Sequence, residues 1–306
     1  MRLKLQPRFG IGLLWATLGF SACFAAREKT TQTALEFKGR IDKGYARLAL
    51  GCVEEADAVF RGALGQAHVT DDVDLIIQAR LALGQTAVRR GDKDDAMAQY
   101  DQALLHARQE HRSALEVESL VGRSGLQPDP GDDLKAARTL CEQSAPAECG
   151  LVYNAQGLEA RRGGRMEEAR RLWESALAAN QGSGRTIRQA DNHLNLGLLD
   201  EVEGRPDAAR AHYLRARELD AQVSNRAGLA QDLLRLSELE EHAERREAAL
   251  SYGLRALGAL EVAGDRNALP ALLDRLIPMA DSPALKNELA ALKEHWAGKT
   301  GPPRCQ

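Results

Sequence analysis

Small and aromatic residues recur along this chain in one fixed order. Each copy has a glycine, an alanine twelve residues later, an aromatic residue four further on and a second alanine three after that. Neighbouring copies start 40 residues apart, at Gly44 and Gly84 and again at Gly157 and Gly197, and a weaker copy follows 40 residues later at Ser237. A period of this length indicates stacked supersecondary units instead of one irregular core. The four clear copies are Gly44, Ala56, Phe60, Ala63; Gly84, Ala96, Tyr100, Ala103; Gly157, Ala169, Trp173, Ala176; and Gly197, Ala209, Tyr213, Ala216.

The spacing within one copy predicts a pair of antiparallel helices. Ala169 and Ala176 lie seven residues apart, which is two helical turns, so they share one face of a helix. Trp173 lies between them and can fill the space that Gly157 leaves on the preceding helix. Gly164 suits the left-handed residue that ends the first helix, and an acidic residue three positions later favours the start of the second. These signals agree in register in every clear copy.

The residues of this pattern resemble those of tetratricopeptide-repeat (TPR) proteins, in the longer class with repeats of roughly 40 residues. The small-residue positions of that family fall on Gly44, Ala56 and Ala63 and on their counterparts, and its leucine before the glycine is matched by Leu83 and Leu196. The resemblance implies an all-α fold: a right-handed α-solenoid of about six TPR helix pairs with a C-terminal capping helix pair.

The expected organisation follows the period, with one damaged copy. In the third repeat Cys141 replaces the aromatic residue, and Pro128 and Pro130 should stop the first helix early. We favour a degenerate repeat that still packs; the alternative is a hinge or a place where a partner enters. The expected segments are a signal peptide over 1–22, a tether over 23–35, repeats over 37–70, 77–110, 118–149, 150–183, 190–223 and 230–263 within 36–263, capping helices over 264–297 and a tail over 298–306.

The first residues have the pattern of an export signal. Basic residues precede an apolar segment over 9–20, which is too short to span a bilayer as a helix, and small residues then lead to Cys23. The sequence Phe20-Ser21-Ala22-Cys23 resembles a bacterial lipobox. That resemblance implies lipidation of Cys23 and attachment to the outer membrane, facing the periplasm. Ordinary cleavage after Ala25 or Ala26, giving a soluble periplasmic protein, remains the alternative.

Two cysteines lie close together in the third repeat. Cys141 is expected to end one helix and Cys149 to begin the next, across a short turn. Neighbouring helix ends can approach disulfide distance, and an exported chain meets oxidising conditions. The two residues form either a disulfide or two buried thiols.

The composition and the absence of known motifs argue against nucleic-acid binding and against enzymatic activity. The formal net charge of −3 becomes more negative once the signal is removed, which argues against a nucleic-acid partner. The chain has no glycine-rich phosphate loop, zinc-binding motif or nucleophile motif. We therefore expect no enzymatic activity, no metal and no cofactor.

The TPR resemblance implies where a partner binds, because the first helices of TPR pairs line the concave surface. The helical phase around the conserved glycine then selects polar residues that face this groove. They are Gln85, Arg89, Asn154, Arg161, Arg162, Asp191, Asn195, Glu201, Gln231 and Glu238.

Together these features predict a non-catalytic, membrane-tethered scaffold or adaptor. Its concave groove would bind a protein or peptide partner, with a role in cell-envelope assembly such as pilus, secretion or outer-membrane biogenesis. The alternative function is a periplasmic regulatory subunit that docks on a peptidoglycan enzyme or a transporter.

Overall fold

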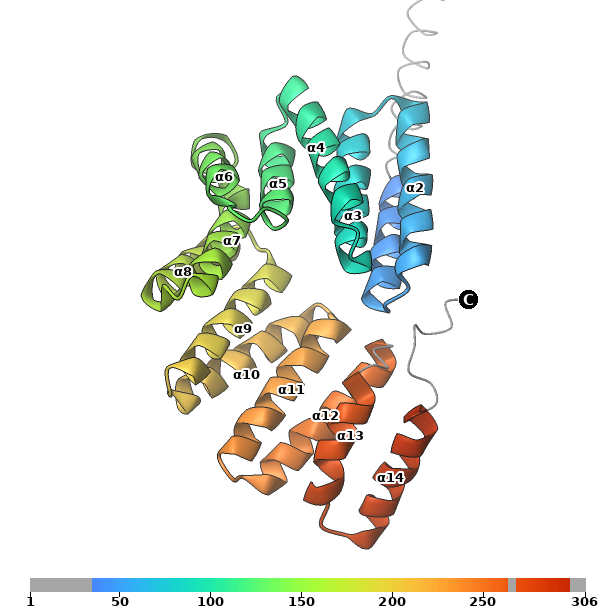
Figure 1. The fold of residues 1–306 in the computed structure, drawn as a ribbon, viewed down its shortest axis with the longest axis vertical. Helices are drawn as coiled ribbons and strands as arrows, with labels where there is room; N and C mark the ends of the chain where they lie inside the picture. The colour runs from blue at the N-terminus through green and yellow to red at the C-terminus, as the bar shows by residue number, and fades with distance from the viewer. Residues whose placement is uncertain (1–34, 264–267, 298–306) are drawn as a thin grey trace, which may run out of the picture.

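The computed structural model describes residues 35–263 and 268–297. Over these ranges the chain forms α-helices joined by turns and one short 3-10 helix, and the described residues contain no strand. The helices pack in successive pairs along the chain (Figure 1). The predicted all-α solenoid is therefore confirmed.

The helices alternate between first and second members of each pair. Residues 35–49 form the first helix, which precedes α2 (Val53–Thr70). The next pairs are α3 (Val73–Arg90) with α4 (Lys93–Gln109), α5 (Ser113–Ser124) with α6 (Gly131–Ser144), and α7 (Cys149–Arg162) with α8 (Met166–Gly182). They are followed by α9 (Thr186–Val202) with α10 (Pro206–Gln222), α11 (Arg226–His242) with α12 (Arg246–Ala263), and α13 (Ala268–Met279) with α14 (Pro283–Ala297).

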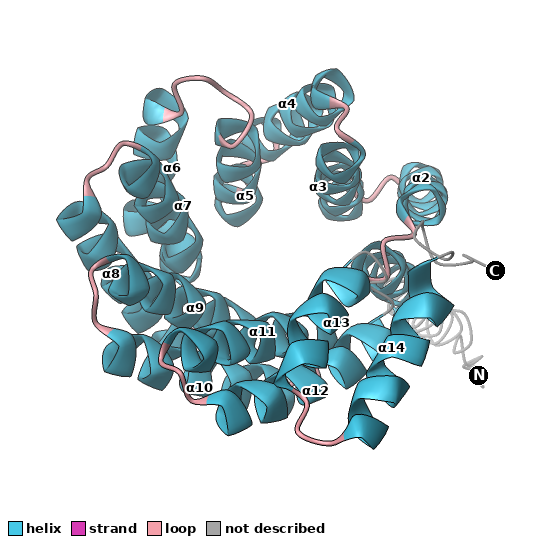
Figure 2. Cartoon of the chain, turned by 60° about the horizontal axis from the view of Figure 1, so that its bottom comes forward, coloured by secondary structure: helices cyan, strands magenta, loops and turns pink. Residues whose placement is uncertain are grey.

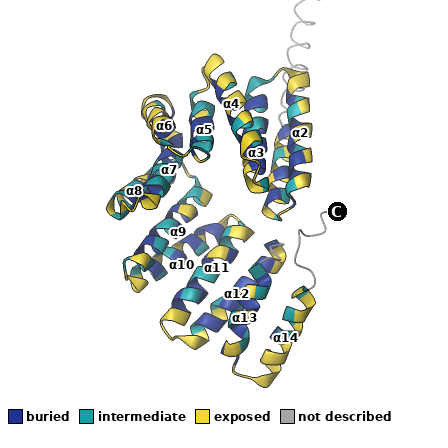
Figure 3. Cartoon of the chain, viewed as in Figure 1, coloured by how far each residue is buried: buried dark blue, intermediate teal, exposed yellow. Residues whose placement is uncertain are grey.

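In four of the pairs an aromatic ring of the second helix packs against a glycine of the first. Trp173 of α8 is fully buried, and a Cβ added to Gly157 of α7 would lie 2.5 Å from its Nε1. Tyr213 of α10 lies in the same way against Gly197 of α9, again at 2.5 Å. The glycine lets the two helix axes approach, and the ring fills the space that the missing side chain leaves. Buried residues follow the faces where helices meet (Figure 3).

The third pair is shorter than the others and packs differently. Helix α5 has 12 residues and α6 has 14, whereas α3 has 18. The ring of Tyr100 from α4 lies between two glycines: an added Cβ would be 2.7 Å from it at Gly84 and 2.5 Å from it at Gly122. The twelve-residue spacing before Ala137 points to Gly125 as the small residue of this pair, but Gly125 follows the end of α5 and Gly122 makes the close contact. This pair therefore accommodates the ring of its neighbour.

A disulfide joins the third pair to the fourth. Cys141 of α6 and Cys149 of α7 are bonded, with an S–S distance of 2.06 Å and Cα atoms 5.2 Å apart. Both residues are buried, and the 3-10 helix η1 (Pro146–Glu148) forms the turn between them. Of the two alternatives that the sequence leaves open, the structure contains the bonded form.

Buried carboxylates also join successive pairs, and they recur with the repeat. Asp200 of α9 is 1% exposed, and its Oδ1 accepts hydrogen bonds from Arg170 of α8 at 2.7 Å and from Arg205 at 2.9 Å. Forty residues along, the buried Glu240 accepts in the same way from Arg210, at 2.6 Å. We call these residues the inter-pair charge network: Arg170, Asp200 and Arg205, and Arg210, Glu240 and Arg245.

The stack curves strongly, with the first helices of the pairs on its inner side (Figure 2). One pocket of about 870 Å³ is lined by residues of the first helix and α3 together with residues of α9 and α11. Helices far apart in sequence therefore face one another across a common space. Within the described residues, none of the helices has the length and apolar character needed to cross a membrane.

Candidate functional site

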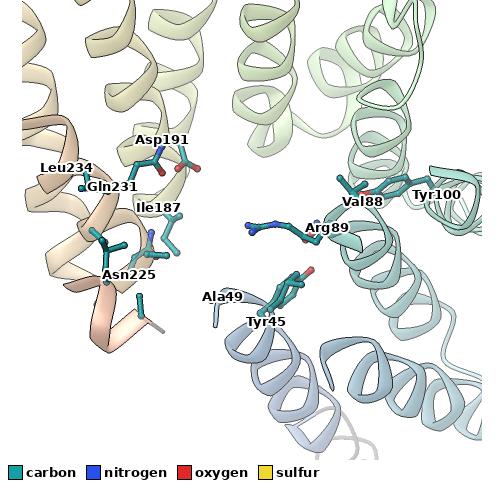
Figure 4. A pocket seen from close by; sticks show the side chains of 16 residues that line it. Tyr45, Ala49, Val88, Arg89, Tyr100, Ile187, Asp191, Asn225, Gln231 and Leu234 are labelled. Atoms are coloured by element: carbon teal, nitrogen blue, oxygen red, sulfur yellow. The ribbon is translucent and has the colours of Figure 1, made fainter. Parts of the chain in front are cut away.

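The central pocket is the candidate site, and we call it the lumen site. Its walls come from two sides of the curved stack, which Figure 4 shows facing each other. The residues that line it include Tyr45 of the first helix, Gln85, Val88 and Arg89 of α3, Ile187 and Asp191 of α9, and Asn225, Gln231 and Leu234 at α11.

Large apolar side chains are exposed on both walls. Tyr45 is 37% exposed, Val88 45% and Ile187 50%. An isolated exposed apolar residue is ordinary, but apolar residues that share one pocket form the kind of surface that binds ligands. The lumen site can therefore bury apolar groups of a partner.

Four polar side chains of the lumen site have no partner among the described residues. Across residues 35–263 and 268–297, the side chains of Gln85, Arg89, Asp191 and Gln231 make no hydrogen bond and no ion pair. The next residue along α3 behaves differently, since Arg90 binds Asp57 at 3.1 Å and Asp95 at 2.7 Å. Folding thus uses Arg90 and leaves the guanidinium of Arg89 available in the pocket.

The carboxyl group of Asp191 has an unusual environment. The surrounding helices desolvate it, and the negative charge of Asp220 adds to that effect, so its pKa is raised to about 6 although Arg188 acts in the opposite direction. Its side chain nevertheless reaches the lumen (Figure 4). Asp191 therefore changes its charge close to neutral pH.

Two buried carboxyl groups lie behind this wall. Asp220 of α10 and Asp232 of α11 are 3% and 1% exposed. Burial raises the pKa of both, and the charge and hydrogen bond of Asp220 add to the effect on Asp232. Like charges this close and this buried are stable only when a proton is held between them. Asn225 donates to Asp220 at 2.9 Å, and Gly228 is needed there because a Cβ would collide with the Asp220 carboxylate.

The structure brings four of the ten predicted groove residues together. Gln85, Arg89, Asp191 and Gln231 line the lumen site. Asn154 lies elsewhere, and its Oδ1 accepts hydrogen bonds from Asn192 at 3.1 Å and from the predicted Asn195 at 3.0 Å. These amides join α7 to α9.

The other predicted residues mostly have partners of their own. Arg161 lies over the Trp173 ring, 6.0 Å from its centroid, and Glu201 accepts a hydrogen bond from the Tyr213 hydroxyl. These two occupy the same position four residues after the conserved glycine, so that position lies beside the aromatic ring of its own pair. The remaining two are Glu238, which pairs with Arg235 and Arg275, and Arg162, which lines a separate cleft of about 180 Å³ beside α5.

The predicted set omitted the apolar half of the site. Tyr45 follows Gly44 by one residue, as Gln85 follows Gly84, and Val88 follows Gly84 by four. The helical phase that selected Gln85 and Arg89 thus also points to Tyr45 and Val88. They were missed because only polar residues were selected.

The described residues hold no group of three or more histidine, cysteine, aspartate or glutamate side chains placed to bind a metal ion. One histidine pair is close: His193 of α9 and His212 of α10 have Nδ1 atoms 2.9 Å apart. Burial lowers the pKa of both rings, so a neutral pair joined by one hydrogen bond accounts for the contact.

Comparison with known proteins identifies the fold. The chain matches no protein-family model and no curated protein. Among solved structures it is similar to a signal-transduction ATPase with numerous domains from Pyrococcus horikoshii that carries a tetratricopeptide-repeat sensor, with a TM-score of 0.63 and 13% identity. That alignment covers 86% of this chain and 43% of the other, so this chain spans less than half of its neighbour's length. BtubC (BKLC) from P. vanneervenii aligns over 85% of this chain and 95% of its own, at 16% identity and a TM-score of 0.44.

The first of these likenesses concerns the fold alone. Its TM-score, together with the successive helix pairs, makes the chain a TPR-like α-solenoid.

Proposed function

We propose that this protein is a non-catalytic scaffold that binds a protein or peptide partner in its lumen site. One observation carries the proposal: exposed apolar side chains and unpaired polar side chains from opposite walls share one pocket. The protein's own fold leaves these groups unused. A partner that buried the apolar groups and paired the polar ones would gain from both.

Site-specific photo-crosslinking tests this proposal. A photoreactive residue placed at Gln85 or at Gln231 should crosslink a partner, whereas one at the exposed Arg171 of α8 should not. Sequencing the crosslinked peptides would show whether the same partner segment contacts both walls. Crosslinks that form only from Arg171 would reject the lumen as the binding surface.

We further propose that the scaffold is tethered to the outer membrane and works in cell-envelope assembly, such as pilus, secretion or outer-membrane biogenesis. The support is in the sequence, in the apolar segment and the lipobox-like Phe20-Ser21-Ala22-Cys23, which lie outside the described residues. A periplasmic regulatory subunit that docks on a peptidoglycan enzyme or transporter is the second candidate. A crosslinked partner's identity would distinguish the two.

Cell fractionation tests the tether separately. Cys23→Ala should leave an unprocessed or differently cut precursor and release the protein from membrane fractions. Mass spectrometry of the wild-type N-terminus should find a lipid on Cys23. A mature chain that starts between residues 24 and 27 without lipid would support the soluble alternative.

A further inference from the structure

The two walls of the lumen site carry opposite charges that have no partner in the part of the chain that the structure describes. Arg89 extends from α3 into the pocket, and Asp191 lines the facing wall on α9 (Figure 4). Neither side chain forms an ion pair within the described residues. Charges in a cleft with protein walls act more strongly on a ligand than charges on an open surface. The lumen site therefore offers one cationic and one anionic contact to the same occupant.

The size of the pocket limits what can enter it. Its volume of about 870 Å³ lies within the range of roughly 300–1,000 Å³ that is usual for small-ligand pockets. A folded partner normally buries about 800 Å² of its own surface in a stable interface, over many residues. The side chains of an extended segment suit the pocket better than the face of a folded domain does.

The remaining lining residues suit a polypeptide. Gln85 and Gln231 each have a side-chain amide that can donate to a main-chain carbonyl and accept from a main-chain N–H. Tyr45, Val88 and Ile187 provide exposed apolar surface in the same pocket as the two charges. A guanidinium such as that of Arg89 binds a carboxylate through two parallel hydrogen bonds.

We propose that the lumen site binds an extended peptide segment that carries both charges. Its carboxylate pairs with Arg89, its amine or guanidinium pairs with Asp191, and an apolar side chain between them contacts Tyr45 and Ile187. The segment crosses the lumen from α3 to α9. This inference rests on the proposed scaffold function and specifies the chemistry of the partner.

Synthetic peptides provide the test. The probes are fluorescein-labelled peptides in which aspartate and lysine are separated by one to four leucine or alanine residues, with both ends blocked. At one of these spacings, fluorescence anisotropy at low salt should show binding at least fivefold tighter than for the same peptide with asparagine or glutamine in place of either charged residue. The difference should shrink as salt is raised. Leaving the C-terminus free shows whether a terminal carboxylate can replace the aspartate side chain.

Charge reversal shows whether the contacts are those proposed. Arg89→Glu and Asp191→Lys should each weaken binding of the two-charge peptide at least fivefold. The double variant should regain most of the affinity, because the segment can bind in the opposite direction. The matched controls Arg171→Glu on α8 and Glu288→Lys on α14 reverse exposed charges that have no ion pair in the described structure, and they should leave binding unchanged.

Other results would overturn the inference. These are equal binding of charged and neutral peptides, no peptide binding at any spacing, or equal losses in the control variants. Lumen crosslinks to a partner segment without this charge pattern would also overturn it, yet they would leave the proposed scaffold function standing. An absence of lumen crosslinks would reject the scaffold function itself.

Discussion

The inter-pair charge network and the lumen site both contain arginines and carboxylates, but they use them differently. In the network, Asp200 and Glu240 are almost fully buried and each accepts hydrogen bonds from two arginines. In the lumen site, Arg89 and Asp191 are exposed and unpaired within the described residues. Buried charges have to be paired, whereas exposed charges do not. We infer that the network holds neighbouring repeats together and that the lumen charges are available for recognition.

Two ion pairs outside this network show that the repeat fixes where charged residues meet but not which of them is positive. Arg170 of α8 pairs with Glu203 after α9 at 2.7 Å, and Asp57 of α2 pairs with Arg90 of α3 at 3.1 Å. Arg170 and Asp57 both follow the first conserved alanine of their copy, and Glu203 and Arg90 both lie six residues after the conserved glycine. The same two positions thus meet in both places with the signs exchanged. The repeat specifies the contact, and each pair satisfies it with its own charges.

The largest loss of stability is expected from a change in the packing between the two helices of a pair. Trp173→Ala should destabilise the fold by about 3–5 kcal/mol, because it empties a fully buried site beside Gly157. The loss should reach adjacent pairs first, since repeats contact mainly their neighbours. Ile187→Ala is the matched control, because Ile187 is 50% exposed in the lumen site. Unchanged hydrogen exchange over residues 150–220 in Trp173→Ala would contradict this packing.

Loss of a buried network acid should have the next largest effect. Glu240→Ala removes hydrogen bonds from Arg210 and Arg245 and should cost about 2–3 kcal/mol. Gln231→Ala, on the same helix but in the lumen site, should change stability by less than about 0.5 kcal/mol. Urea titrations of the two variants would compare the regions directly. Equal losses would mean that the lumen residues also support the fold.

The effect of Glu240 should depend on pH. Burial disfavours its charge, but the hydrogen bonds and charges of Arg210 and Arg245 outweigh that cost, so its pKa is lowered. Its contribution is therefore present above the ordinary glutamate pKa near 4.3 and is lost as the pH falls through the lowered value. The stability difference between wild type and Glu240→Ala should shrink in acid.

The sequence predicts the repeats far better than it predicts these two regions. The glycine, alanine and aromatic spacing is a local signal, so the helix pairs and the contact between Gly157 and Trp173 can be expected from it. The arginines and acids of the network also recur every 40 residues, but charged residues on a helix usually indicate a solvated surface, and burial has to be seen in the structure. For the third pair the prediction is wrong in detail, because its close contact uses Gly122, three residues before the Gly125 that the twelve-residue spacing to Ala137 indicates.

The lumen site depends on the curvature of the whole stack. Small rotations between successive pairs add up, and only their sum determines that α3 faces α9 and α11. The phase of each first helix could select Gln85, Arg89, Asp191 and Gln231, but nothing local separates them from Glu201, which contacts Tyr213 in its own pair.

The carboxyl pair at the junction of α10 and α11 should have the opposite pH dependence to Glu240. The pKa of Asp232 is raised by burial and by the charge of Asp220, so the protonated form is the one that the fold stabilises. That stability is fully present below the ordinary aspartate pKa near 4 and is lost as the pH rises through the raised value. Asp232→Asn keeps the shape and removes the charge, so it should stabilise the protein by about 1–2 kcal/mol at alkaline pH and have little effect near pH 4.

Thermal melts of wild type and Asp232→Asn between pH 4 and pH 9 would measure this effect. The melting temperature of the variant should change less with pH than that of the wild type. If both curves fall together, the two carboxyl groups do not share a proton in the folded protein.

The smallest effect on stability is expected in the lumen site, where the effect on recognition should be largest. Asp191→Asn should not destabilise the protein, because the side chain is exposed and makes no hydrogen bond or ion pair within the described residues, and it should be slightly stabilising above pH 6, where the wild-type carboxylate is charged. Desolvation and the negative charge of Asp220 raise the pKa of Asp191 to about 6, although Arg188 lowers it. The Asp232 carboxyl group on α11 also interacts with the charge of Asp191. Protonation below pH 6 therefore removes the negative charge from this wall and leaves Arg89 as the unpaired charge opposite.

Binding of the two-charge peptide should weaken between pH 7 and pH 5 in wild type, and Asp191→Asn should bind weakly and equally at both pH values. A pH-dependent loss that persists in Asp191→Asn would assign the titration to another group and remove Asp191 from the recognition surface.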